Sequence, residues 1–239
     1  KDSGTILLYQ SGYTITDADL EKFSFTNTSA GYEMTLESNG SVKLILPHKH
    51  TLCNRTTHSG AGHSDSCDTS IKFDEWTDAA AREKYGEGAT AANCLPNEGS
   101  WYLTKPVTLT ATHEVDGGKL NLCLNGNSVT LGADGEVFSI KNGGVLNLTD
   151  CKGTGSITHA DSSNGAGVSV GAGSDETTAG TFNLYNGNIT GNRNTNGEGG
   201  GVSVLSGGQF NMYGGTITEN KAATGGGVNV ADNATVTIG

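Results

Sequence analysis

The C-terminal half of the chain repeats one short glycine-rich cassette, and no other feature constrains the fold as strongly. Each copy has a G-V-x-V motif, followed by an apolar residue with Asn or Thr after it. Most copies also have a T-I-T or N-I-T motif. The copies include GAGVSV from Gly165, FNLYNGNITGN from Phe182, GGGVSV from Gly199, FNMYGGTITEN from Phe210 and GGGVNV from Gly225. A unit this short cannot bury its own apolar side chains, so the copies must stack on one another as a solenoid.

Anchor residues at equivalent positions define the register of the repeat. Leu120 and Leu146 are 26 residues apart, Leu146 and Phe182 are 36, Phe182 and Phe210 are 28, and Phe210 and Val236 are 26. Apolar and polar residues alternate within each unit, which is the period of a strand rather than of a helix. Short strands with glycine and asparagine at the corners predict an all-β chain folded as a right-handed parallel β-helix.

One interval is longer than the others and predicts a surface loop. Five residues separate Val204 from Phe210, but eleven separate Val170 from Phe182. The six extra residues fall in the polar segment GAGSDETTAG, residues 171–180. Such a segment can leave the stack without disturbing the core, either as a tolerated insertion or as a binding loop.

The chain divides by pattern into three regions. Residues 1–47 contain YEMTLES, Asn39-Gly40 and SVKLIL, which predict a β-hairpin with a two-residue turn. Residues 48–100 form an irregular His/Cys-rich segment, and residues 101–239 form the solenoid. Because the first coil of a solenoid exposes unpaired strand edges, we expect the first two regions to cap it.

A short helix is predicted inside the second region. Its expected range is residues 78–85, with Thr77 as the N-cap and Gly86 as the stop. The chain begins at Lys1 without Met and ends at Gly239 within a cassette, so we expect it to be part of a longer protein with further repeats after residue 239.

Composition favours an extracellular structural chain over several other classes. The sequence has 37 glycines and only 16% charged residues, and its apolar positions are regular, which fits tight-cornered β-structure rather than disorder. The net charge of −11 argues against nucleic acids and anionic membrane surfaces as partners. No segment reaches the length of a membrane span, so we expect no membrane insertion here.

From residue 95 onward the chain also resembles a known group. The stretches SWYLTKPVTLTATHEVDGGKLNLCLNGNSVTL and GGVLNLTDCKGTGSIT, followed by the GGGV-x-V and FNMYGGTITEN units, resemble the glycine-rich right-handed β-helix repeat regions of large secreted or surface-anchored bacterial proteins. The His/Cys segment resembles one that often precedes such repeats. The resemblance implies surface display with an adhesive or scaffold role, and it assigns no catalytic residue.

The His/Cys segment contains the densest set of chemically active side chains. Four of the six histidines and three of the five cysteines lie in residues 48–100. Imidazole and thiolate groups suit tetrahedral zinc, which would serve a structural role here. The alternative is a Cys53–Cys67 disulfide with solvated histidines, as an oxidising exterior would favour. The candidate zinc ligands are His48, His50, Cys53, His63 and Cys67.

The remaining cysteines lie on or near the solenoid. An offset of 26 residues aligns Cys123 with Thr149, two residues before Cys151, so a bridge between Cys123 and Cys151 is compatible with the register but not required by it. Cys94 is then unpaired, and we expect a free buried thiol there.

Equivalent Asn and Tyr residues are weak candidates for a ligand-binding surface. Alternation should direct Asn183, Tyr185, Asn211 and Tyr213 away from the core. Tyrosine rings beside amides could hold a carbohydrate or another host-surface ligand, but a structural ladder of like side chains explains the same pattern. Asn192 and Asn220 follow the T-I-T steps, where we expect corner residues in the left-handed region.

The sequence therefore favours a surface-displayed structural or adhesive module. The alternative is a polysaccharide lyase or glycoside hydrolase built on a β-helix. Glycoside hydrolysis needs paired carboxylates at a fixed separation. The solenoid carboxylates do not recur in register, and Arg193 is the only arginine among residues 101–239.

Overall fold

The computed structural model of the 239-residue chain describes residues 3–6, 16, 33–36, 42–45, 47–52, 70–172 and 178–239. These residues are nearly all in strands and turns, with one helix among them. The chain forms two compact units, Lys1–Lys49 and His50–Gly239. No helix in the described part has the length and apolarity needed to cross a membrane.

The first unit contains a three-stranded antiparallel sheet. Its strands are β1 (Ser3–Ile6), β2 (Glu33–Leu36) and β3 (Val42–Ile45), with β3 in the middle. The pairing of β2 with β3 agrees with the predicted hairpin, and Leu36 lies opposite Val42. The predicted Asn39-Gly40 turn lies outside the described residues.

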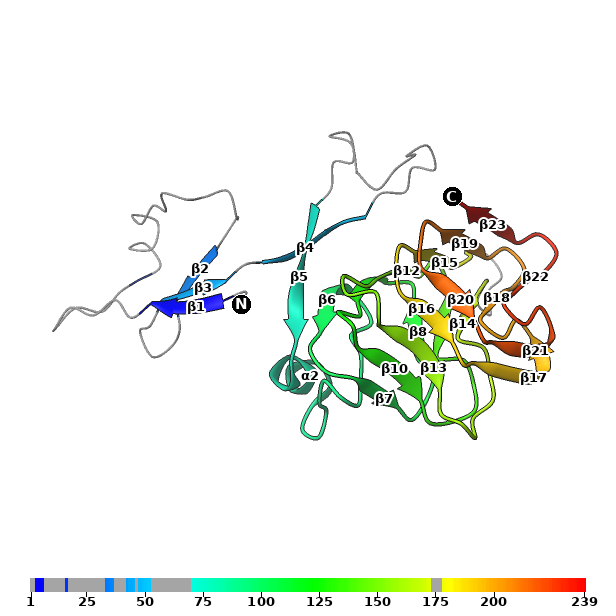
Figure 1. Ribbon diagram of the computed structural model, residues 1–239, viewed down its shortest axis with the longest axis horizontal. Coiled ribbons are helices and arrows are strands. Elements are labelled where there is room, and N and C mark those ends of the chain that lie inside the picture. Colours follow the sequence, from blue (N-terminus) through cyan, green and yellow to red (C-terminus); the bar gives the residue numbers. More distant parts are fainter. Residues whose placement is uncertain are drawn as a thin grey trace. The chain divides into compact units, whose positions relative to one another are not determined.

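The second unit stacks parallel strands into three principal sheets (Figure 1). The chain visits the sheets in the same order on each coil, so strands 21 to 36 residues apart become neighbours. This arrangement confirms a solenoid-like all-β fold with parallel sheets.

The largest sheet has eight strands in the order β23-β19-β15-β12-β9-β6-β5-β4. Its strands are β4 (His48–Thr51), β5 (Ser70–Trp76), β6 (Gly99–Leu103), β9 (Lys119–Cys123), β12 (Val145–Thr149), β15 (Thr181–Leu184), β19 (Gln209–Met212) and β23 (Thr235–Ile238).

Two five-stranded sheets complete each coil. The first contains β7 (Val107–Leu109), β10 (Ser128–Leu131), β13 (Ser156–His159), β16 (Asn188–Thr190) and β20 (Thr216–Thr218). The second contains β8 (His113–Asp116), β11 (Phe138–Lys141), β14 (Val168–Val170), β18 (Val202–Val204) and β22 (Val228–Val230). A short pair, β17 (Arg193–Glu198) and β21 (Lys221–Thr224), joins the last two coils.

The observed register confirms the register predicted from the anchor residues. Leu120, Leu146, Phe182, Phe210 and Val236 are successive Cα partners along the largest sheet. The rings of Phe182 and Phe210 are stacked, with centroids 5.2 Å apart and an interplanar angle of 11°. The sequence repeat therefore positions like residues directly on top of one another.

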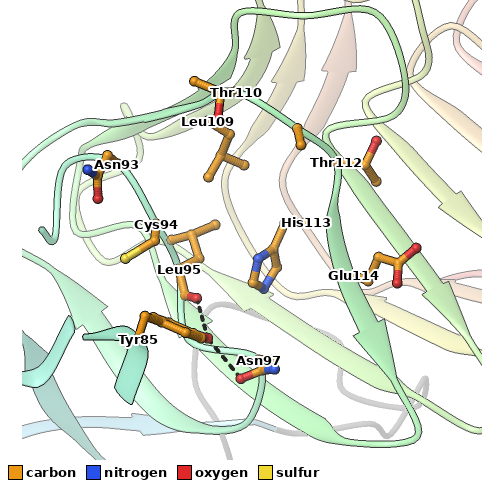
Figure 2. Close-up of a pocket in the computed structure, with 11 residues that line it drawn as sticks. Tyr85, Asn93, Cys94, Leu95, Asn97, Leu109, Thr110, Thr112, His113 and Glu114 are labelled. Carbon is orange, nitrogen blue, oxygen red and sulfur yellow. Dashed lines mark hydrogen bonds between the residues drawn. The ribbon is translucent and has the colours of Figure 1, made fainter. Parts of the chain in front are cut away.

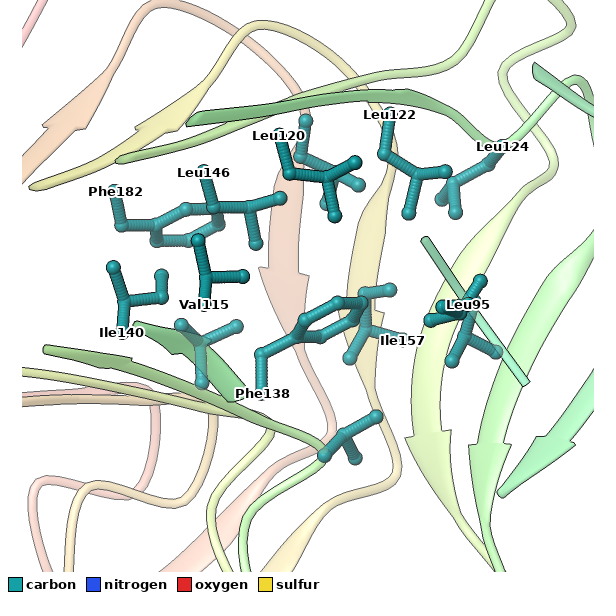
Figure 3. Packing of buried hydrophobic residues seen from close by; sticks show 14 of the residues in the cluster. Leu95, Val115, Leu120, Leu122, Leu124, Phe138, Ile140, Leu146, Ile157 and Phe182 are labelled. Carbon is teal, nitrogen blue, oxygen red and sulfur yellow. The ribbon is translucent and has the colours of Figure 1, made fainter. Parts of the chain in front are cut away.

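The core lies between the three sheets, as Figure 3 shows. Leu120, Leu146 and Phe182 point inward from the largest sheet, and Phe138 and Ile157 meet them from the two five-stranded sheets. All five side chains are fully buried. Each coil thus buries apolar side chains that it could not bury alone, which is the stabilising principle of a solenoid.

Glycines at one corner let neighbouring coils approach closely. Gly180 precedes β15, and a Cβ atom there would collide with the carbonyl oxygen of Ile140. Gly208 precedes β19 in the same way and would collide with the carbonyl oxygen of Val170. The glycine content of the cassette therefore has a steric cause at these positions.

Backbone pairing joins the two ends of the segment that makes the interval between Val170 and Phe182 longer than the others. Ala172 and Ala179 form an antiparallel bridge, and the amide of Gly180 donates to the carbonyl of Gly171 over 2.8 Å. The strands on either side keep the register of the neighbouring coils. Ala172 and Ala179 are thus paired at the base of the longer interval, and residues 173–177 of the predicted loop lie outside the described residues.

We expect deletion of residues 173–178 to leave the fold intact. The deletion removes the six extra residues and restores the interval found in the other coils, and shortening a surface loop changes the closure entropy only slightly. Circular dichroism and thermal melting should match those of the parent chain. Aggregation or loss of the β-type spectrum would show that the segment is an integral part of the coil.

The helix begins and ends at the predicted residues. Helix α2 (Asp78–Tyr85) starts after Thr77, whose hydroxyl oxygen accepts from the amide of Ala80 over 3.1 Å. Gly86 follows with a φ of 87° and donates its amide to Arg82. Together with residues 93–97 and strand β8, the end of α2 borders a pocket on the surface of the second unit (Figure 2).

The expected left-handed conformation of Asn192 and Asn220 is wrong. The positive φ values occur one residue earlier, at Gly191 and Glu219. Asn192 is buried, and its amide Nδ2 donates to Oδ1 of Asn220 over 2.9 Å and to the carbonyl of Ile157 over 3.1 Å. The corner therefore uses the side-chain amides to satisfy backbone groups of adjacent coils.

Candidate metal centre

Four side chains with metal-binding atoms converge beside the largest sheet. They come from His48 and His50 on β4, Cys123 at the end of β9, and Cys151 just after β12. One ligand atom from each lies within 4.8 Å of every other. This set can hold a metal ion. His50, Cys123 and Cys151 belong to the second unit.

The parallel register of two coils brings the cysteines together. Thr149 lies directly opposite Cys123, and the chain turns immediately after it, so Cys151 follows two residues later on the adjacent coil. The two sulfur atoms are 3.8 Å apart. They are therefore in contact but not bonded, since an S–S bond is about 2.05 Å long.

The two thiols have different surroundings. Cys123 is fully buried, whereas Cys151 is exposed. Burial raises the pKa of the Cys123 thiol from 9.0 to about 12. At neutral pH this thiol stays protonated unless a cation replaces the proton, because a thiolate in a low-dielectric site needs a compensating charge.

Backbone contacts around Asp150 hold the Cys151 turn in place. The Asp150 carboxylate is buried and accepts from the amide of Gly126 over 2.6 Å and from that of Gly155 over 2.7 Å. Asn125, in the left-handed region at φ 49°, presents its Oδ1 to the Cys151 sulfur at 3.5 Å. Cys151 therefore sits on a turn braced by the preceding coil, which favours a fixed ligand position.

The His50 ring is packed against an aromatic side chain. Its plane lies at 89° to that of Phe73 on β5, with centroids 4.9 Å apart. Residues His48 and His50 are two apart on a strand and so share one face of β4. Because β4 and β9 lie in the same sheet, the two histidines and Cys123 come from one sheet, and Cys151 comes from the turn after β12.

The observed cluster contains two of the five ligands predicted from the sequence. His48 and His50 belong to it. Cys53, His63 and Cys67 lie outside the described residues. The sequence spacing predicts Cys123 and Cys151 on adjacent coils, but it does not connect them with the histidines, which precede Cys123 by more than 70 residues. The third solenoid-side cysteine, Cys94, is a free thiol as predicted but only half-buried, and its sulfur donates to the carbonyl of Thr90 over 3.2 Å.

The predicted ligand-binding amides form a ladder. Asn147 Nδ2 donates to Asn121, Asn183 donates to Asn147, and Asn211 donates to Asn183, each over 2.7 or 2.8 Å to Oδ1. Each of these amides donates to the amide oxygen of the preceding coil, and Asn147 and Asn183 also accept from the following coil. This ladder is the structural alternative considered for these residues.

The tyrosines beside this ladder also repeat from coil to coil. Tyr185 and Tyr213 stack with centroids 5.0 Å apart and an interplanar angle of 24°. Both side chains are half-buried. They present a continuous aromatic pair rather than two separate rings.

Comparison of the chain with protein-family models, with curated proteins and with solved structures found no match.

Proposed function

We propose that this chain is a structural and adhesive module of a cell surface, built as a right-handed parallel β-helix and fastened by one zinc ion. The zinc ligands are His48, His50, Cys123 and Cys151. The observation that carries the proposal is the convergence of two imidazoles and two thiols within 4.8 Å of one another.

The separation of the sulfur atoms supports zinc. In a tetrahedral site with zinc–sulfur bonds of about 2.3 Å, two thiolate sulfurs lie about 3.8 Å apart. The Cys123 and Cys151 sulfurs are separated by this distance. Two histidines and two cysteines are also a common ligand set of structural zinc sites, which have all four positions filled by protein and leave none for a substrate.

A structural role follows from where the ligands lie in the sheet. Cys123 and Cys151 belong to adjacent coils, and His50 belongs to a strand at the edge of the same sheet. One ion would tie this edge strand to two coils whose own stability comes from stacking. The regular display of outward side chains, including the Tyr185 and Tyr213 pair, supports the adhesive part of the proposal.

Metal analysis of variants tests this function. Protein purified without a chelator should carry one zinc per chain, and Cys123→Ser and His50→Ala should each lose most of it, because each removes one of four ligands. Cys94→Ser is the matched control and should retain full occupancy. The double variant Cys53→Ser/Cys67→Ser should also retain it. Zinc that survives in Cys123→Ser but is lost in the double variant would overturn the proposed ligand set.

A further inference from the structure

A pocket separate from the metal centre lies between the end of α2 and the start of β8. Its cavity volume is about 440 Å³, which is within the range of small-molecule sites. In Figure 2, Tyr85 and Asn97 border one end, Thr110 and Thr112 border the opposite end, and His113 points between them. One side of the pocket comes from the segment that precedes the coils, and the other side comes from residues 109–114 of the first coil.

One wall of the pocket is fixed by hydrogen bonds. The Tyr85 hydroxyl lies 2.9 Å from the carbonyl oxygen of Leu95 and 2.9 Å from Oδ1 of Asn97. His113 Nε2 lies 3.0 Å from the carbonyl oxygen of Pro96, to which only a protonated nitrogen can donate. The ring therefore carries its proton on Nε2 and leaves Nδ1 as an acceptor. Figure 2 shows the two Tyr85 bonds as dashed lines.

Other polar groups that line the pocket can still form hydrogen bonds with a ligand. Among the described residues, the side-chain hydroxyls of Thr110 and Thr112 form no hydrogen bond with protein groups. Glu114 uses one carboxylate oxygen to accept from Lys141 Nζ over 2.8 Å, and its second oxygen has no such partner in this part of the chain. A ligand would therefore meet two hydroxyls and one carboxylate oxygen that can still form hydrogen bonds.

The charge of the lining disfavours anions. Glu114 is the one residue of the lining that is charged at neutral pH, since burial lowers the pKa of His113 from 6.5 to about 4 and keeps its ring neutral. The Tyr85 side chain is 42% exposed and offers an aromatic surface beside these polar groups. An exposed aromatic face, hydroxyls and a carboxylate together suit a ligand with an apolar face and many hydroxyl donors.

We infer that this pocket binds a neutral saccharide residue, with Glu114 and Thr112 as hydrogen-bonding groups and the Tyr85 ring as its apolar contact. The inference rests on the adhesive part of the proposed function. It names the class of ligand that the module would bind and the pocket that would bind it. This pocket is a different site from the stacked pair of Tyr185 and Tyr213, whose neighbouring amides bond to one another in the ladder.

Saturation-transfer NMR with methyl glycosides tests the inference. The probes are methyl glucoside, galactoside and mannoside as neutral sugars, with glucosamine and a sialic acid as charged comparisons. At least one neutral glycoside should bind, and Glu114→Gln and Thr112→Val should each weaken it by about tenfold or more, as expected for loss of a hydrogen bond to a charged or buried group. Glu83→Gln, an exposed carboxylate on α2 outside the pocket, is the matched control and should bind like the parent.

Each contrary result identifies what is wrong. Thr110→Val, at an exposed position, provides a second variant if Thr112→Val lowers the melting temperature. Binding that all pocket variants retain but Tyr185→Ala loses would overturn the pocket and keep a saccharide-binding function. Preferential binding of the charged sugars would overturn the ligand class. Absence of binding to every probe would overturn this inference, while the zinc measurements would still decide the structural part of the proposed function.

Discussion

Replacing Phe210 with alanine is expected to lower the free energy of unfolding by about 3–5 kcal/mol. Phe210 is fully buried and lies between Phe182 and Val236 of the adjacent coils. Its ring stacks on that of Phe182, so truncation removes contacts with a neighbouring coil and leaves a cavity that the flanking strands cannot close. Urea or thermal unfolding measures the loss.

Two further substitutions make this result specific to packing. Phe210→Leu keeps most of the apolar volume and should cost clearly less than the alanine variant. Gln209→Ala changes the exposed neighbour on the same strand and should stay within about 0.5 kcal/mol of the parent. If Phe210→Ala unfolded at the same denaturant concentration as Gln209→Ala, the register of the coils would be wrong.

Removing zinc is expected to loosen one edge of the largest sheet while the coils remain folded. The coils bury a continuous core of their own, whereas β4 is tied to Cys123 and Cys151 by shared ligands in our account. Amide exchange in β4 and in the turn after β12 should become faster by more than about tenfold, the equivalent of about 1.4 kcal/mol, and exchange in β15 and β19 should change little. Hydrogen-exchange mass spectrometry with and without a chelator measures this.

The same experiment distinguishes zinc from a disulfide. If Cys123 and Cys151 were bonded to each other, a chelator would have no effect and a reductant would produce the local loosening. Cys94→Ser should respond to the chelator like the parent, because Cys94 lies outside the cluster. Equally faster amide exchange in all coils after chelation would contradict the claim that the stacked core is stable without the metal.

The register of the fold could be read from the sequence because like residues stack on like residues. The spacing of Leu146, Phe182 and Phe210 gives the strand pairing directly. The ends of α2 were also predictable, since a threonine cap and a glycine stop act locally. These features depend on neighbours along the chain or on the recurrence of like residues from coil to coil.

The metal centre was only partly predictable because its ligands are far apart in the sequence. His48 and His50 were recognised from their density, but density alone pointed to the nearby cysteines at 53 and 67. The histidines lie near Cys123 and Cys151 only in the folded chain, and no local sequence pattern encodes that placement. The one available sequence signal was that Cys151 lies two residues after Thr149, the partner of Cys123. The turn after β12 brings the two cysteine sulfurs into contact.

The pocket at His113 had no sequence signal for a related reason. Its walls come from a segment outside the repeat and from the first strands of the solenoid. The error at Asn192 has a different cause. Its side chain turns inward to bond with Asn220, while the preceding Gly191 takes the left-handed conformation that the corner needs. Amide stacking between coils outweighed the local turn preference of asparagine.

X-ray absorption spectroscopy at the zinc edge, on protein purified without a chelator, tests the central claim most directly. The account predicts a four-coordinate site with two sulfur ligands at about 2.3 Å and two nitrogen ligands at about 2.0 Å, falling to one sulfur in any zinc that Cys151→Ser retains. A site with only nitrogen and oxygen ligands, or a metal-free protein in which a peptide containing Cys123 is disulfide-linked to one containing Cys151, would contradict it.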